Sequence, residues 1–149
     1  MGDQHQILIL KTGAAGDVVR TTCILSHFQD SIITWLTDAA CMPLFDTVRF
    51  KNLNVYPVNN FPPEILVTKY QLVLSLEEDE YCARIAGRLH TEKITGIYWN
   101  NGFAYTEDAA GWFNMSLVSI YGRARANELK RSNTLSYPEH LFSMLQLRF

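Results

Sequence analysis

The clearest pattern in the chain is a run of four apolar residues, Ile7 to Leu10, followed by small residues and then by a helical period. A strand with one solvated face would alternate apolar and polar residues, so the unbroken run predicts a strand buried on both faces. The segment after it predicts a helix that ends near residue 29. Four positions at helical spacing share one face of that helix: Val18, Thr22, Leu25 and Phe28.

Similar patterns along the rest of the chain predict alternating strands and helices. Strands are expected at residues 31–36, within 48–58, at 71–76 and at 94–99, with a hairpin through Asn101-Gly102 to residues 103–105. Helices are expected at residues 39–45, 62–67, 77–90, 106–120 and 136–145, the last opened by a Ser136-to-Glu139 capping box. Residues 123–134 predict a loop or frayed helix. This alternation predicts an α/β fold with a mainly parallel sheet.

The loop after the first strand is the first place to expect a ligand, because parallel α/β sheets bind ligands outside the carboxyl ends of their strands. A dinucleotide fingerprint needs three glycines, and this loop has only Gly13 and Gly16. A nucleotide P-loop needs Lys and Ser or Thr after its second glycine, whereas Asp17 stands there. What remains is a loop of small residues with a carboxylate at a helix start. The alternative reading is that Asp17 only caps the helix.

Residues 9–22, Ile-Leu-Lys-Thr-Gly-Ala-Ala-Gly-Asp-Val-Val-Arg-Thr-Thr, resemble the opening of the ADP-heptose:lipopolysaccharide heptosyltransferases, the ninth glycosyltransferase family. Residues 33–38, 70–76 and 105–117 are similar to later segments of that family, in the same order. The resemblance implies a Rossmann-like, mainly parallel sheet flanked by helices, the amino-terminal half of a GT-B type glycosyltransferase. It implies that residues 1–149 form a single acceptor-side domain, and that the carboxy-terminal donor domain is absent.

The same resemblance implies an inverting transfer of a heptose or related sugar from a nucleotide sugar to a lipopolysaccharide-type glycan acceptor. Asp17 would be the general base. No cofactor and no metal are implied, and the isolated chain is expected to be inactive without a donor domain. The residues implied to bind substrate are Lys11, Thr12, Gly13, Ala14 and Gly16.

A rival hypothesis is a non-catalytic, flavodoxin-like or receiver-like protein that binds a small molecule or a partner at the same loop. A receiver needs acidic residues at two strand ends, and Asp17 with the cluster at residues 77–80 could be taken for them. A flavin site needs several hydroxyls in the loop, where Thr12 stands alone. The acidic cluster itself is expected to be a solvated helix start rather than a metal site.

Composition restricts the remaining possibilities. With 149 residues, 48% of them apolar, the chain matches one globular domain. A formal net charge of −2 gives no basis for nucleic-acid binding. Cations exceed anions beyond Tyr121, which suits an anionic acceptor, a peripheral membrane contact or a solvated tail.

Localisation is expected to be cytoplasmic, because no leader and no run of about 20 apolar residues is found. A peripheral contact with the inner face of the cytoplasmic membrane is left open. Cys23, Cys41 and Cys82 are expected to be buried small residues in a reducing compartment. Trp112 is expected in or beside the core rather than as a sugar platform.

Overall fold

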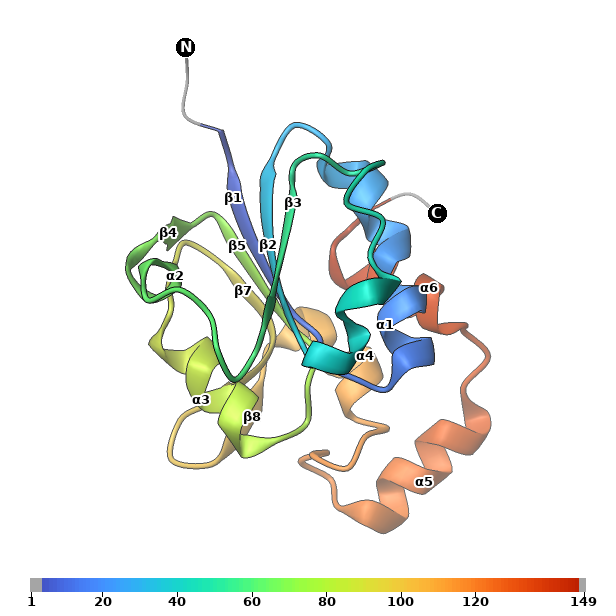
Figure 1. Cartoon of the computed structure of the whole chain (residues 1–149). Coiled ribbons are helices and arrows are strands. Elements are labelled where there is room, and N and C mark those ends of the chain that lie inside the picture. The colour runs from blue at the N-terminus through green and yellow to red at the C-terminus, as the bar shows by residue number, and fades with distance from the viewer. Residues whose placement is uncertain (1–3, 148–149) are drawn as a thin grey trace.

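The computed structural model describes residues 4–147, and Figure 1 shows its strands and helices. The strands are β1 (Gln6–Leu10), β2 (Ile32–Thr37), β3 (Leu53–Pro57), β4 (Lys69–Tyr70), β5 (Leu72–Ser75), β6 (His90–Thr91), β7 (Ile94–Trp99) and β8 (Phe103–Tyr105). The α-helices are α1 (Ala15–Thr21), α2 (Glu64–Val67), α3 (Glu80–Arg88), α4 (Ala110–Phe113), α5 (Arg123–Ser132) and α6 (Tyr137–Met144). The 3₁₀ helices are η1 (Thr22–Phe28), η2 (Ala39–Leu44) and η3 (Glu107–Ala109).

Six strands form one sheet in the order β3-β2-β1-β5-β7-β8. Every neighbouring pair is parallel except the β7–β8 hairpin. The short strands β4 and β6 pair separately, in parallel. The expected α/β class with a mainly parallel sheet is therefore confirmed. The chain builds outward from β1 to β3 and then crosses back to β5, so the order reverses between β1 and β5.

Strand β1 lies at the centre of the sheet and is buried on both faces, as predicted. Residues Ile7 to Leu10 are each at most 4% exposed. Ile7 and Ile9 pack into the core under α1, η1 and α6, whereas Leu8 and Leu10 pack into the core under α2 and α3. Helices therefore cover both faces of the sheet (Figure 1).

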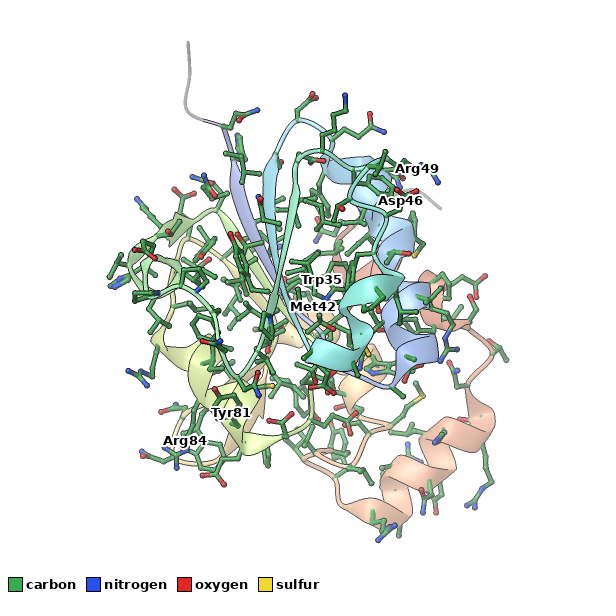
Figure 2. All side chains as sticks on the ribbon, in the orientation of Figure 1. Trp35, Met42, Asp46, Arg49, Tyr81 and Arg84 are labelled. Atoms are coloured by element: carbon green, nitrogen blue, oxygen red, sulfur yellow. The ribbon has the colours of Figure 1, made fainter. Side chains whose placement is uncertain are left out.

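Trp35 anchors the outer part of this core. Its side chain is fully buried on β2, and its ring meets the ring of Phe45 edge to face with centroids 4.8 Å apart. Figure 2 labels Trp35 on β2 and Met42 on η2. Because Phe45 directly follows η2, this contact holds the end of the short η2 segment against the sheet.

Two local sequence signals are confirmed in detail. The β7–β8 turn has positive φ at Asn101 (55°) and Gly102 (143°), the conformation for which Asn and Gly are suited. The capping box of α6 has both of its bonds: the Glu139 amide donates to Ser136 Oγ at 3.3 Å, and the Ser136 amide donates to Glu139 Oε2 at 2.6 Å.

The helix predicted over residues 106–120 is wrong in its second half. Helix α4 ends at Phe113, and Leu117 and Ile120 are 81% and 69% exposed instead of facing the core. Ser116 explains the break, because its hydroxyl donates to the Phe113 carbonyl at 2.8 Å and accepts from the Val118 amide at 3.2 Å. Such side-chain bonds give the backbone an alternative to the helix.

The segment that follows also differs from expectation. Gly122 lies directly before α5 as its N-cap, with a φ of 82°. Residues Arg123–Ser132 form a regular helix, where a loop or a frayed helix was predicted. Only Ala126 of α5 is buried.

The first helix changes from α1 to the 3₁₀ helix η1 after Thr21. Thr21, and not Thr22 as predicted, lies on the face with Val18 and is buried. The three-residue repeat of a 3₁₀ helix accounts for this shift. Cys23 on η1 is exposed, contrary to the prediction, whereas Cys41 and Cys82 are buried as expected. Within residues 4–147, no helix has the length and apolarity that crossing a membrane requires.

The sheet leaves no room for a side chain at Gly96, which generates the first prediction. Gly96 has a φ of 112°, and a Cβ there would lie 1.8 Å from the Ser75 carbonyl oxygen on the neighbouring strand. We expect Gly96→Ala to lower the free energy of unfolding by at least about 2 kcal/mol. Urea unfolding measures this. Gly111→Ala is the control, because its Cβ would meet nothing within 4 Å. Equal stability of the two variants would contradict the packing.

Candidate functional site

The loops after β1 and β5 are joined by the carboxylate of Glu77. Its Oε1 accepts hydrogen bonds from the backbone amides of Thr12 (2.7 Å) and Gly13 (3.1 Å). The same oxygen lies 3.0 Å from the ammonium of Lys11. The two charged side chains are only 10% and 13% exposed. Three donors therefore satisfy one buried charge at the point where the strand order reverses.

The loop after β1 is also held from the side of β2. The Thr12 carbonyl accepts from the Asp38 amide at 3.1 Å and from the Thr37 hydroxyl at 3.2 Å. The Trp35 indole donates to the Lys11 carbonyl at 2.9 Å. A Cβ at Gly13 would lie 3.2 Å from Asp38 Oδ2, so only a small residue fits there without displacement. Contacts from both neighbouring strands thus fix the loop backbone.

The prediction that residues 77–80 form a solvated helix start is wrong for Glu77. Helix α3 begins only at Glu80, and its cap is Asp79, whose carboxylate accepts from the Cys82 amide at 2.8 Å. Glu77 instead turns toward the loop after β1. One sequence signal could have identified it: Glu77 directly follows the apolar strand predicted at residues 71–76, and in a parallel sheet such positions share one edge.

Asp17 is the third residue of α1 and not its cap. The N-cap is Ala14, which makes no side-chain capping bond, so the capping interpretation of Asp17 is wrong. The Asp17 carboxylate pairs with Arg20, and its side chain is 36% exposed. The Arg20 guanidinium in turn lies over the ring of Tyr137, 5.0 Å from the centroid. The carboxylate is therefore oriented while still open to solvent.

Tyr137 reaches this site from α6. Its hydroxyl lies 2.7 Å from the Thr21 hydroxyl. Burial raises the pKa of Tyr137 to about 12, and the nearby Asp17 carboxylate acts in the same direction. The phenol therefore stays protonated at neutral pH and can act as a hydrogen-bond donor.

A cavity of about 200 Å³ opens at this place. Of the residues implied by the resemblance, Lys11 and Asp17 line it. Thr12, Gly13 and Ala14, in the loop after β1, and Gly16, in the first turn of α1, are not among the lining residues. Distant segments supply the other lining residues, which the sequence interpretation did not assign to a site: Leu76, Glu77, Glu78, Trp112 and Tyr137.

A larger cavity of about 660 Å³ lies next to it, between α5 and the turn after α4. The two cavities share Glu78 and Trp112. Burial raises the pKa of the Glu78 carboxyl, opposed by a backbone hydrogen bond from Leu117 and by the charge of Lys11. Trp112 packs beside the core, as predicted, with its ring 5.0 Å from the ring of Tyr137. It also forms part of the wall of both cavities.

His140 lies behind Trp112, with ring centroids 5.3 Å apart. It is 7% exposed, and its Nε2 lies 2.9 Å from Asn133 Oδ1. Burial lowers the pKa of His140, and the charge of Glu139 only partly offsets this. The ring is therefore held neutral behind the wall of the cavities.

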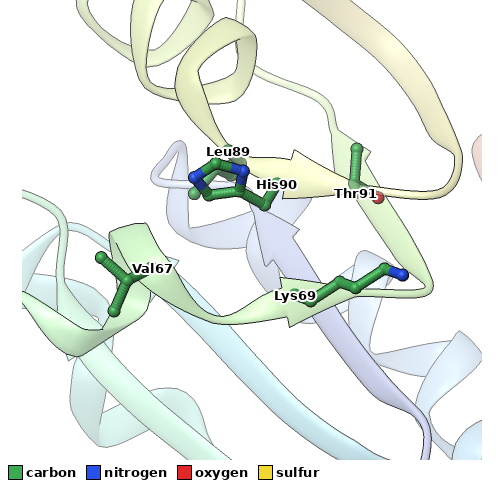
Figure 3. Close-up of a pocket in the computed structure, with 5 residues that line it drawn as sticks. All are labelled: Val67, Lys69, Leu89, His90 and Thr91. Atoms are coloured by element: carbon green, nitrogen blue, oxygen red, sulfur yellow. The ribbon is translucent and has the colours of Figure 1, made fainter.

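Another cavity, of about 530 Å³, lies at the short strands β4 and β6 (Figure 3). Val67, Lys69, Leu89, His90 and Thr91 line it. These residues belong to or adjoin β4 and β6, which precede β5 and β7, so this cavity lies at the amino ends of the strands. Parallel sheets bind their ligands at the opposite ends.

Chemically, the site at the carboxyl ends offers the solvent-accessible carboxylate of Asp17, the half-buried carboxyl of Glu78, a neutral phenol and an indole face. Within residues 4–147, no group of three or more His, Cys, Asp or Glu side chains could hold a metal ion. Comparisons of the chain with protein-family models, curated proteins and solved structures find no match. The functional argument therefore depends on these residues and on the fold.

The buried ion pair generates the second prediction. Glu77→Gln removes the charge that compensates the Lys11 ammonium, and breaking a buried pair on one side costs about 3 kcal/mol or more. We expect that loss in the free energy of unfolding measured with urea. Glu80→Gln is the matched control, since Glu80 and Arg84 form a pair in which both side chains are 55% exposed. That control should cost less than about 1 kcal/mol, and equal losses would contradict the assigned role of Glu77.

The third prediction concerns pH. Because the pKa of His140 is lowered in the folded state, the unfolded chain takes up this proton at higher pH. His140 therefore makes its full contribution to stability above the pKa of about 6.5 that it has in the unfolded chain. That contribution is lost as the pH falls below this value toward the lower pKa of the folded state. We expect His140→Gln to flatten the decline in the free energy of unfolding between about pH 7.5 and about pH 5. His90→Gln, at an exposed position, is the control. A decline as steep as that of the parent protein would refute the assignment.

Proposed function

We propose that this chain is the acceptor-side domain of an inverting GT-B type glycosyltransferase, similar to the ADP-heptose:lipopolysaccharide heptosyltransferases. The observation that carries the proposal is the Asp17 carboxylate in the cavity at the carboxyl ends of β1 and β5. At that reversal of strand order, open α/β sheets bind their ligands. The sugar acceptor would enter there.

The topology supports a Rossmann-like half over the rival architecture. Without β4 and β6, the five parallel strands follow the order 3-2-1-4-5, which is the Rossmann-type arrangement. Flavodoxin-like and receiver-like proteins have the order 2-1-3-4-5. The observed strand order therefore supports the proposal over the rival hypothesis, although neither order by itself assigns a reaction.

In the proposed reaction, an acceptor hydroxyl attacks the anomeric carbon of a nucleotide sugar. The new C–O bond forms as the bond to the diphosphate breaks, and the nucleotide diphosphate leaves with the electron pair. Asp17 takes the proton of the attacking hydroxyl as general base. Arg20 orients the carboxylate through the ion pair on α1. Closure of a second domain over the cavity would remove water from Asp17 and strengthen it as a base.

The other proposed site residues divide into two kinds. Gly13, Ala14 and Gly16 let an acceptor approach the backbone, because they carry no bulky side chain. Lys11 and Thr12 hold the loop through Glu77 and the end of β2, so they are positioning residues in this proposal. The indole of Trp112 lines the cavity, so the acceptor can pack against an apolar ring there.

The donor requires a second domain, in the same polypeptide or in a partner. A helix amino terminus is a common site for phosphate, but here the Asp17 carboxylate occupies the first turn of α1 and repels an anion. The proposal thus assigns the nucleotide sugar to the other domain and the glycan acceptor to this one. It needs no cofactor and no nucleic acid.

The fourth prediction tests the base. In the enzyme assembled with its donor domain and given ADP-heptose, we expect Asp17→Asn to slow the chemical step by about two to four orders of magnitude. The melting temperature should barely change, because asparagine keeps the shape of the side chain and a hydrogen-bond acceptor for Arg20. Asp46→Asn is the control, in the loop near Arg49 (Figure 2). Turnover retained in Asp17→Asn would remove the catalytic assignment.

A further inference from the structure

The turn that leads into α5 exposes a group of large apolar side chains. Leu117, Ile120 and Tyr121 are 81%, 69% and 58% exposed. Single exposed apolar residues are normal on protein surfaces. Here three exposed apolar side chains lie within five consecutive residues, and we refer to them as the apolar patch. A local gathering of this kind is typical of interaction sites.

This patch adjoins the most cationic part of the chain. Residues 114–134 carry four cations and one anion, although the whole chain has a formal net charge of −2. Arg125 pairs with Glu128 at 3.1 Å. Within residues 4–147, Arg123 and Arg131 form no ion pair. A positive region thus stands on an otherwise acidic protein.

The apolar turn and the cationic helix belong to one surface. Leu117 lines the 660 Å³ cavity together with Arg123 and Lys130 of α5, so the turn and the helix face the same space. In Figure 1, α5 stands off from the sheet at the lower right, beyond the strand ends from which α1 starts. The surface is therefore free to meet a broad partner.

We propose that Leu117, Ile120, Tyr121 and the cations of α5 form a docking surface for a membrane that contains anionic phospholipid. Aliphatic and aromatic side chains insert at the boundary between headgroups and acyl chains, while arginine and lysine pair with the headgroup phosphates. This combination matches a lipid surface in both chemistry and charge. A nucleic-acid backbone would match the cations but leave the apolar group unpartnered.

Docking goes beyond the proposed transfer and does not depend on it. It would nevertheless place the Asp17 cavity near the lipid surface, since the cavity beside α5 shares Glu78 and Trp112 with it. An acceptor glycan attached to a lipid could then reach Asp17 without leaving the membrane.

Co-sedimentation with vesicles tests the docking surface. We expect the chain to sediment with vesicles of phosphatidylcholine mixed with phosphatidylglycerol, but not with phosphatidylcholine alone, and added salt should weaken the binding. Arg123→Gln with Arg131→Gln should weaken it about fivefold for each lost cation. Leu117→Ser with Ile120→Ser should weaken it by about tenfold or more.

Two matched controls lie away from this surface. Val48→Ser changes a side chain that is 84% exposed, and Arg88→Gln removes an exposed cation on α3. Both should bind anionic vesicles as the parent protein does, and circular dichroism should show that every variant is folded. Asp17→Asn should also bind normally, which separates this proposal from the catalytic one.

Three outcomes would overturn the docking surface. The first is no binding to anionic vesicles by the parent chain. The second is equal binding by the Leu117 and Ile120 variant and the Val48 control. The third is a dimer in solution that dissociates on Leu117→Ser with Ile120→Ser, which would assign the patch to a second copy of the chain.

Discussion

The site depends on the ion pair and the hydrogen bonds that the buried carboxylate of Glu77 makes. A buried charge is costly unless it is paired and hydrogen-bonded, and Glu77 meets both conditions through Lys11 and two backbone amides. Those three donors come from the segment just after β1, whereas Glu77 comes just after β5. Satisfying one charge therefore fixes two loops that are 65 residues apart in sequence.

Most of the fold could be predicted because its signals are local. The apolar run at β1, the Asn101-Gly102 turn and the Ser136 capping box each specify their structure within a few residues, and each is confirmed. The errors arose where a local signal competed with another group. Ser116 ends the helix that periodicity extended to Ile120, and Glu77 leaves the helix start that its acidic neighbours suggested.

The candidate site was predictable only where one segment supplies it. Lys11 and Asp17 are six residues apart, so a single motif pointed to both. Trp112 and Tyr137 enter the same cavity from elements about a hundred residues further along the chain, and no pattern near either residue indicates where the sheet and helices will bring it. Tertiary packing, not local propensity, completes the site.

The indole of Trp112 is a wall common to two cavities, and this has a thermodynamic consequence. Its ring contacts the rings of Tyr137 and His140, so a ligand cannot move the indole without disturbing them. Since the ring lines both cavities, a molecule that moved it from one cavity would also change the shape of the other. Thermodynamic linkage makes this effect mutual. If a molecule in one cavity changes the binding free energy of a molecule in the other, the second molecule changes the binding free energy of the first by the same amount.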